Sequence, residues 1–428
     1  MTAPLGAHPR PTPLSPGRTV MSVGTPGLPP HPSTAALVAV LGALSALSPF
    51  ATDMYTPAFP EIVTSLGTTA GAVQLSLTAC LAGLAVGQVV LGPASDALGR
   101  RRVLLAGCAA FAVLSLVCAL APSAPVFTVA RLAQGAAGSA GLVVARAVVG
   151  DRFTGTAAAR HLATLSVIAM TAPVLAPVTG GLLLSVGSWR LVFTALAAAG
   201  LALGAAVWAW VPETLPAGRR RGGGLRAAAT ATGALLRRRE LTGHLLVLGC
   251  ALAAVFAYIT GAPFVFQDGY GLSATAYGLV FAANAAGTVA TGVLFARLAG
   301  RVPLRVLLAA GVLATAGCAL ALGVLLAAGV STLATTWLCL FGLTSGFGLV
   351  LPAATTVVVD AGRAAPGAAS GLLGGTQFAL GAVAAPLPGA WGPTTAASMT
   401  AVVAGFVLLS TAALCTLCRP RRACRGPR

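Results

Sequence analysis

The sequence predicts an all-α membrane protein of twelve transmembrane helices, arranged as two pseudosymmetric six-helix halves. Of its 428 residues 57% are hydrophobic and only 8% are charged, whereas a soluble domain of this size carries about a quarter charged residues. The apolar runs are continuous rather than alternating, which favours helices over a barrel. A basic segment at 212–243 divides these runs into two sets of six, as in a protein with two related halves.

Twelve apolar runs are long enough for a helix to cross a bilayer, which takes about 20 residues. Turn-forming and charged residues between the runs place them at 34–56, 72–94, 102–121, 125–147, 161–185, 189–211, 244–266, 272–295, 303–327, 331–356, 368–390 and 395–417. The N-terminal tail, 1–33, is predicted to be disordered and cytoplasmic. Two six-helix bundles, 34–211 and 244–417, flank a basic cytoplasmic loop, 212–243, and a basic C-terminal tail, 418–428, follows. No signal peptide is expected, and Met1 and Met21 are both possible first residues.

All 26 basic residues are arginines, and the formal net charge is +18. They lie in short clusters between apolar runs rather than in one patch, so nucleic-acid binding is not expected. With both termini in the cytoplasm, every arginine except Arg131, Arg146 and Arg190 falls in a cytoplasmic segment. The positive-inside rule therefore predicts a multi-pass inner-membrane protein with that orientation.

Metal and cofactor sites are not predicted. Most of the nine cysteines fall inside apolar runs, and the lone Cys415-x-x-Cys418 pair is weak support for a metal. No clustered His, Cys and Glu set suggests an enzyme. A receptor would need a sizeable soluble domain, which the sequence lacks.

Two ionisable residues lie within predicted spans and are candidates for proton coupling. Asp53 is near the outer end of the first span, and Arg131 is on the fourth. A charge in the hydrocarbon costs about 3 kcal/mol or more, so such groups usually line a wet cavity. Asp53 has the chemistry of a proton-binding carboxylate. The alternatives are that Asp53 merely ends a helix and that Arg131 reaches the outer headgroups.

A charged turn between the second and third spans contains Asp96 and Arg100, and Asp151 ends the fourth span. Charge-assisted hydrogen bonds among these three residues would tie the spans together, and we expect them to act as a cytoplasmic gate. The alternative is that these charges only set the orientation.

The fifth span carries two prolines and a glycine pair. Pro173 and Pro177 each remove a backbone hydrogen bond, so with Gly180 and Gly181 they predict a kink that acts as a hinge or a tight seam. The polar residues predicted to line a substrate cavity are Tyr55, Gln134, Tyr258, Asn284 and Gln377, with Gln74 and Gln88 as further candidates. Each is equally consistent with a hydrogen bond between helices.

Taken together, these residues resemble the Bcr/CflA family of drug:proton antiporters, the bicyclomycin and chloramphenicol resistance type within the major facilitator superfamily. The motifs that carry the resemblance are Thr52-Asp-Met-Tyr-x-Pro, Val73-Gln-Leu-x-Leu-Thr, Gly92-Pro-x-Ser-Asp-x-x-Gly-Arg-Arg, Arg131-x-x-Gln-Gly, Ala145-Arg-Ala-Val-Val-x-Asp151, Ala176-Pro-x-x-Gly-Gly, Trp189-Arg and Pro212-Glu-Thr-Leu. They extend over about residues 40–400.

The resemblance implies the major facilitator fold and alternating access between two halves. It implies proton or substrate binding at Asp53, proton transfer at Arg131, and an outward-facing state held by the gate residues. Two residues depart from the family pattern. Ala97 replaces a basic residue of the turn, and Ser45 stands where some relatives carry a second acid.

The predicted function is therefore efflux of a small hydrophobic or amphiphilic compound, amphenicol- or bicyclomycin-like, in exchange for a proton. One cavity acid favours neutral or monocationic substrates. The expected partners are the drug, protons and the lipid bilayer, and the protein is expected to be a monomer. The alternative is an exporter of an endogenous metabolite or a nutrient:proton symporter of the same fold.

Overall fold

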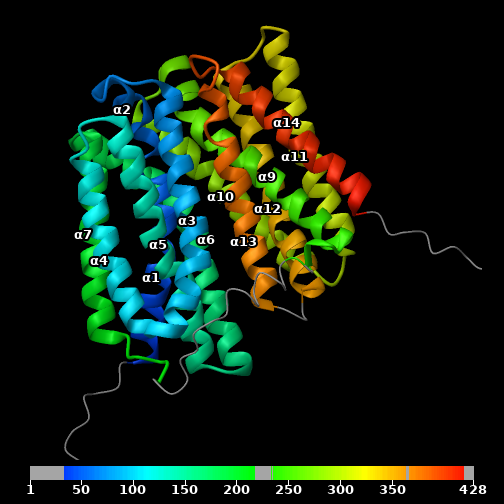
Figure 1. Cartoon of the computed structure of the whole chain (residues 1–428). Coiled ribbons are helices and arrows are strands. Elements are labelled where there is room, and N and C mark those ends of the chain that lie inside the picture. The colour runs from blue at the N-terminus through cyan, green and yellow to red at the C-terminus, as the bar shows by residue number, and fades with distance from the viewer. Residues whose placement is uncertain (1–32, 217–232, 234, 363–365, 419–428) are drawn as a thin grey trace, which may run out of the picture.

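The computed structural model describes residues 33–216, 233, 235–362 and 366–418 (Figure 1). Within them, twelve helices of 19 residues or more form two groups of six. The first group is α1 (Thr34–Asp53), α3 (Ala70–Leu98), α4 (Arg100–Ala119), α5 (Ala124–Arg152), α6 (Gly155–Val186) and α7 (Trp189–Trp210). The second is α9 (Arg239–Pro263), α10 (Ala274–Leu298), α11 (Leu304–Ala327), α12 (Leu333–Ala361), α13 (Pro366–Ala384) and α14 (Ala396–Leu417). The predicted fold class is confirmed.

Eleven of these helices, counted over the described residues, are long and apolar enough to cross a membrane. The twelfth, α13, is rich in glycine and carries Gln377, which lowers its hydropathy. The predicted tails fall almost entirely outside the described residues, as does 217–232 of the predicted central loop. Within that loop, α9 already begins at Arg239.

Short polar side chains begin several of the helices. Ser33, Thr69, Ser273, Thr332 and Thr395 each accept a hydrogen bond from a backbone N–H in the first turn of the helix that follows. These bonds satisfy N–H groups that have no partner within the helix. Between α3 and α4 the chain reverses at Gly99, whose φ of 102° favours glycine.

Helix packing repeats between the two halves. In each half the second helix packs on the fourth, the third on the sixth, and the first on the fifth. In the first half these pairs are α3 with α5, α4 with α7 and α1 with α6. The halves meet through α3 against α13 and through α6 against α10, so the second helix of each half contacts the fifth of the other. This exchange is the pseudo-two-fold symmetry predicted for the fold, and Figure 1 shows the halves side by side.

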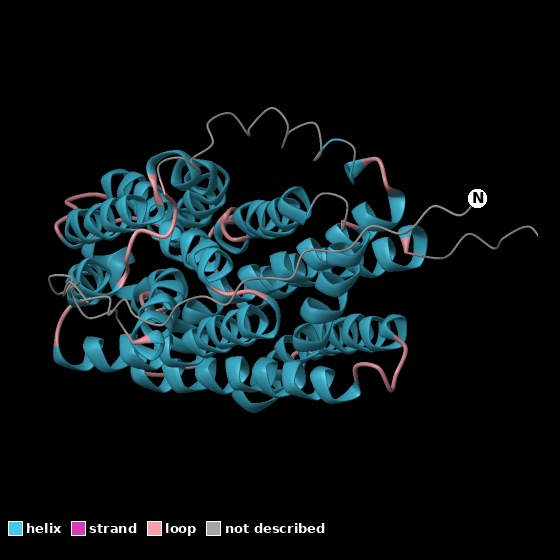
Figure 2. Ribbon diagram, turned by 90° about the horizontal axis from the view of Figure 1, so that it is seen from below, coloured by secondary structure: helices cyan, strands magenta, loops and turns pink. Residues whose placement is uncertain are grey.

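The bundle has two distinct ends. We call the end where α1 begins, which carries Arg100, Arg152 and Arg297, the arginine-rich end; α1 finishes at the opposite end. Two short helices, η1 (Thr56–Ala58) and α2 (Phe59–Ser65), follow α1 there, and η3 (Phe264–Gly269) follows α9. Figure 2 shows the helices of both halves from below.

The halves share a buried core at the opposite end and have separate cores at the arginine-rich end. Tyr55, Phe193, Tyr258 and Phe266 belong to one hydrophobic cluster that includes residues of both halves. Towards the arginine-rich end, the described residues form separate clusters. The cluster around Leu41 contains residues of the first half only, and two other clusters contain residues of the second half only. Among the described residues, the halves therefore share a hydrophobic core at the opposite end and none at the arginine-rich end.

Additional contacts between the halves reinforce the closed end. The Gln74 side chain donates to the Thr260 carbonyl at 3.1 Å and to the Thr394 hydroxyl at 3.0 Å. Two further bonds run from Gln267 to the Pro57 carbonyl, 2.9 Å, and from Thr275 to the Gly181 carbonyl, 3.0 Å. Gln74, a candidate cavity residue in the sequence, thus joins helices instead.

Glycines permit the close contact of α5 with its neighbours. A Cβ added at Gly135 would collide with the backbone carbonyl of Cys80 on α3, and one at Gly141 would lie 2.5 Å from the Leu44 carbonyl on α1. Small residues at membrane-helix contacts allow backbones to approach in this way. By contrast, a Cβ at Gly323 on α11 would meet nothing within 4 Å.

We therefore expect Gly135→Ala to destabilise the protein, because the backbone atoms it meets cannot move aside; overpacking costs about 1–3 kcal/mol. The midpoint of thermal unfolding of the purified protein in detergent should fall. Gly323→Ala is the matched control and should leave the midpoint unchanged or raise it. Equal midpoints for the two variants would contradict this description of the α3–α5 contact.

Candidate functional site

A cavity of about 340 Å³ lies between the two halves. Its walls come from α1, α3, α5 and α6 on one side and from α9, α10, α12 and α13 on the other. Its lining is largely apolar, with a few polar groups. A concave, mainly apolar site with few polar groups is typical of a small-molecule pocket, and its volume is at the lower end of the usual range of about 300–1,000 Å³. The polar lining residues are Ser48, Thr52, Asp53, Tyr258, Asn284, Thr288, Thr344 and Gln377.

Asp53 is the last residue of α1 and lines this cavity, with 5% of its surface exposed. The helix ends there because Pro57 follows in η1, and the Thr56 hydroxyl donates to the Asp53 carbonyl at 2.9 Å. The lining contains no other carboxylate and no arginine. The structure thus places one buried acid in an apolar cavity shared by both halves.

Arg131 on α5 is completely buried and does not line the cavity. Its guanidinium donates to the Ala51 carbonyl at 2.9 Å and to the Gln134 side chain, and lies 4.3 Å from the centre of the Tyr55 ring. Neither of the two ion pairs between described residues involves Arg131. Hydrogen bonds and an aromatic face compensate its burial instead.

Tyr55 and Gln134 therefore differ from their predicted place in the cavity wall. Both are completely buried, contact Arg131 and do not line the cavity. The Tyr55 hydroxyl bonds Ser76 at 3.1 Å, and the Gln134 amide donates to Ser115 at 2.6 Å. The Gln134 side-chain oxygen and the Tyr55 ring support the buried guanidinium, because a cation without partners would be costly there.

The other three predicted cavity residues do line the cavity, and all three belong to the second half: Tyr258 on α9, Asn284 on α10 and Gln377 on α13. Asn284 donates to the Tyr258 hydroxyl at 2.8 Å and accepts from the Trp337 indole at 3.0 Å. Its amide is thus used between helices. Gln377 makes no hydrogen bond with the described residues, so its amide is available to the cavity.

The proline and glycine motif of α6 lies where the halves meet, and α6 runs through it as one helix. Pro173 lines the cavity, and the Pro177 carbonyl would be 2.6 Å from a Cβ at Gly278 of α10. A Cβ at Gly180 would collide with the Met54 carbonyl, and one at Gly181 with the backbone of α10. Of the two predicted alternatives, hinge and tight seam, these contacts favour the seam.

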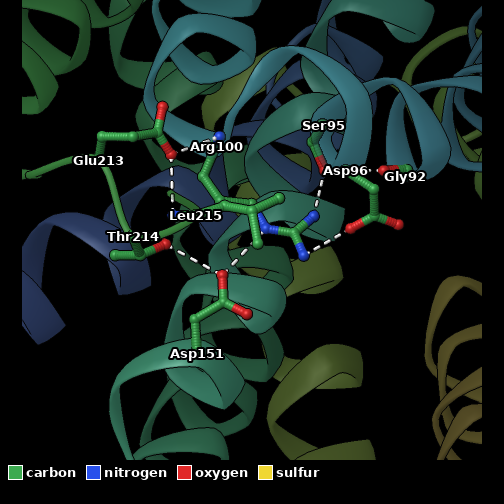
Figure 3. Close-up of polar contacts among 8 residues, drawn as sticks. All are labelled: Gly92, Ser95, Asp96, Arg100, Asp151, Glu213, Thr214 and Leu215. Carbon is green, nitrogen blue, oxygen red and sulfur yellow. Dashed lines mark hydrogen bonds and ion pairs between the residues drawn. The ribbon is translucent and has the colours of Figure 1, made fainter. Parts of the chain in front are cut away.

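The charged turn forms a cluster around Arg100, which Figure 3 shows. The Arg100 guanidinium contacts Asp96 at 2.6 Å, Asp151 at 3.0 Å and the Ser95 hydroxyl. Asp151 also accepts from the Thr214 hydroxyl at 3.0 Å. The cluster therefore links α3, α4 and α5 with the segment that follows α7.

All of these contacts lie within the first half, at the arginine-rich end. The three predicted gate residues are thus bonded to one another while that end is not sealed by a shared core. Their mutual bonds fix the shape of one half. They do not by themselves join the two halves.

Two glutamates that lie between the long helices cap helices distant from them in the sequence. Glu213 accepts from the first N–H of α4, at Arg100, at 2.9 Å, and Glu61 accepts from the first N–H of α7, at Trp189, at 3.1 Å. A carboxylate at a helix N-terminus satisfies an unpaired donor and interacts favourably with the helix dipole. Each glutamate is distant in sequence from the helix it caps, so the sequence alone predicted neither contact.

Comparison with known proteins identifies relatives along most of the chain. The sequence profile described as "Major Facilitator Superfamily" matches residues 41–386. An uncharacterized MFS-type transporter, YdgK of Bacillus subtilis (strain 168), is 37% identical over 90% of this chain and 96% of its own. The bicyclomycin resistance protein homolog of Haemophilus influenzae is 29% identical over 89% and 96%. The chloramphenicol resistance protein of Pseudomonas aeruginosa is 36% identical over 63% and 62%.

Among solved structures, the xylose transporter XylE from E. coli, in a partially occluded inward open conformation, matches with a TM-score of 0.71. The match covers 92% of this chain and 99% of that one at 12% identity. At this identity the likeness concerns the fold alone. It agrees with the arrangement of two six-helix halves.

The contacts within the charged cluster predict unequal contributions of its two aspartates to stability. Asp96 has a half-exposed side chain, 50%, and one bond to Arg100, whereas Asp151 is 22% exposed and accepts two bonds. An exposed ion pair contributes about 0–1 kcal/mol, and a hydrogen bond to a charged group about 1.5–3 kcal/mol. Asp151→Asn should therefore lower the thermal unfolding midpoint more than Asp96→Asn. The reverse order would contradict this description.

The stacking of Arg131 on Tyr55 predicts that the ring matters more than the hydroxyl. Tyr55→Phe keeps the aromatic face and loses the bond to Ser76, about 1 kcal/mol. Tyr55→Leu also loses the cation–π contact, about 2 kcal/mol when desolvated. The leucine variant should therefore have the lower free energy of unfolding in detergent. Equal losses would show that the aromatic face does not stabilise Arg131.

Proposed function

The chain belongs to the major facilitator superfamily, and we propose that it exports small hydrophobic or amphiphilic compounds across the cytoplasmic membrane in exchange for protons. The observation that carries this proposal is the single carboxylate, Asp53, in an apolar cavity between the two halves. The names of the bicyclomycin and chloramphenicol resistance relatives support the drug class.

Asp53 is the proposed site where proton and substrate compete. A carboxylate removed from water takes up a proton more readily, and a substrate that restores its hydrogen bonding or pairs with its charge favours release of that proton. Proton entry from outside would then discharge the substrate, and substrate binding from inside would discharge the proton. This reciprocity couples the two flows.

Arg131 supports this exchange without carrying the proton, because a guanidinium does not lose its proton in a protein. Its bond to the Ala51 carbonyl fixes the end of α1 two residues before Asp53. Its fixed charge then lowers the free energy of the ionised carboxylate relative to the protonated one. In this proposal Arg131 acts on Asp53 through position and charge.

Transport proceeds by alternating access of two bodies, 34–211 and 244–417, in a monomer whose termini are both cytoplasmic. The arginine content of one end supports this orientation, because cytoplasmic segments retain arginine. The conformation described here then faces the cytoplasm. In the outward-facing state, the half shaped by Asp96, Arg100 and Asp151 would close against α13 and α10.

Neutral and monocationic compounds fit the cavity, because its lining supplies one acid and no basic side chain. The membrane potential contributes about 2.3 kcal/mol per charge per 100 mV, and a tenfold concentration ratio needs about 1.4 kcal/mol. One proton per neutral molecule thus supports a gradient of more than tenfold. No second acid is required.

Asp53→Asn tests the proposal, because asparagine keeps the size of the side chain and cannot take up the proton. In everted membrane vesicles with an imposed proton gradient, the wild-type protein should accumulate chloramphenicol, and a protonophore should abolish the accumulation. Uphill accumulation by the variant should be at least about tenfold lower than that by the wild-type protein, because one proton supports a concentration ratio of at least that size. It should still exchange chloramphenicol down its gradient.

Asp268→Asn is the matched control, because Asp268 is an exposed acid at the opposite end and does not line the cavity. It should transport like the wild-type protein. Uphill accumulation by Asp53→Asn, or accumulation that survives the protonophore, would refute coupling at Asp53. Proton-driven movement of chloramphenicol towards the cytoplasmic side would instead indicate a symporter.

A further inference from the structure

Three side chains from three helices form a chain of hydrogen bonds in the second half of the protein. Trp337 of α12 donates from its indole nitrogen to Asn284 Oδ1 at 3.0 Å. Asn284 of α10 donates from Nδ2 to the Tyr258 hydroxyl of α9 at 2.8 Å. Tyr258 and Asn284 line the cavity, so this chain ends at the site described above.

The direction of these bonds is fixed by chemistry, not by the placement of the amide. An indole N–H can only donate, so the Asn284 oxygen must face Trp337. The Asn284 nitrogen must then face Tyr258, where it can only donate. Asn284 thus presents a donor to the Tyr258 hydroxyl, and the alternative orientation of the amide would place two donors against each other at Trp337.

This polarity leaves the hydroxyl hydrogen of Tyr258 free. Its oxygen already accepts from Asn284, so the hydroxyl can donate only in another direction. No oxygen of the described residues accepts that hydrogen. Tyr258 is 2% exposed and part of the cavity wall. A buried donor without a partner is costly, and a ligand in the cavity can satisfy it.

Aromatic side chains share the cavity wall with Tyr258. The Phe281 ring stacks on the Tyr258 ring with centroids 5.9 Å apart and planes inclined by 19°. Phe256, Phe347 and Phe378 line the same cavity. This half of the wall is suited to an aromatic or apolar body that carries a hydrogen-bond acceptor near Tyr258.

We propose that the Tyr258 hydroxyl is a substrate-binding donor that selects compounds with a carbonyl, nitro or ether oxygen attached to an aromatic or apolar body. Asn284 and Trp337 are positioning residues that fix the direction of this donor. The inference rests on the proposed function and deepens it. Asp53 in the first half is the acceptor and Tyr258 in the second is the donor, so a bound compound contacts both halves.

Two probes separate the hydroxyl from the rest of the wall. Chloramphenicol is neutral and carries carbonyl and nitro oxygens, whereas tetraphenylphosphonium is an aromatic cation without a hydrogen-bond acceptor. Equilibrium binding of each radiolabelled probe to the purified full-length protein is compared for wild type and Tyr258→Phe. The variant should bind chloramphenicol about five- to tenfold more weakly, and its affinity for tetraphenylphosphonium should be unchanged.

Tyr270→Phe is the matched control, because the Tyr270 hydroxyl bonds Thr336 at 2.8 Å and does not line the cavity. It should bind both probes like the wild-type protein. Unchanged chloramphenicol affinity in Tyr258→Phe would overturn the inference, as would an equal loss for both probes, because a packing defect lacks selectivity. If the wild-type protein binds neither probe, the proposed substrate class is wrong as well.

Trp337→Phe tests the positioning role. Without the indole donor, the Asn284 amide can turn its oxygen towards Tyr258 and accept the hydroxyl hydrogen. Chloramphenicol binding should weaken in this variant and tetraphenylphosphonium binding should not, although Trp337 does not line the cavity. Trp210→Phe, at an exposed tryptophan, is the control. A chloramphenicol to tetraphenylphosphonium affinity ratio equal to that of wild type would refute the positioning role.

Discussion

The buried guanidinium of Arg131 is the constraint on which the rest of the site depends. A cation sealed away from water must find partners inside the protein, and Arg131 finds them at the last turn of α1 and on the Tyr55 ring. The carbonyls at the end of a helix lack partners within it and carry partial negative charge, so they suit a cation. This bond joins α1 to α5 two residues before Asp53, which lines the cavity at the end of α1.

Hydropathy and arginine placement were enough to predict the twelve helices and their division into two halves, because each span must be apolar over a length set by the bilayer. The same reasoning identified Asp53 and Arg131, since a charge within an apolar run is costly wherever it points. It failed at the direction of side chains. Tyr55 and Gln134 belong to motifs beside the two charges, yet they face Arg131 and not the cavity.

Contacts distant in the sequence were beyond prediction for the same reason. Glu213 caps α4 and Glu61 caps α7, each across more than a hundred residues. The sequence marks them only as polar residues between helices. Likewise, the polar chain from Trp337 to Tyr258 joins three helices whose relative rotation no single-sequence periodicity determines. The apolar content of a segment predicts a helix, whereas packing determines which neighbour each face of that helix contacts.

The closed seam at the opposite end is joined, in the described residues, by bonds from neutral amides and hydroxyls, and mostly to main-chain carbonyls. When the seam separates, each donor and acceptor can bond to water in place of its former partner at little net cost. No charge is stranded by that separation. In the proposed alternating-access cycle, parting of this seam is therefore expected to be insensitive to ionic strength.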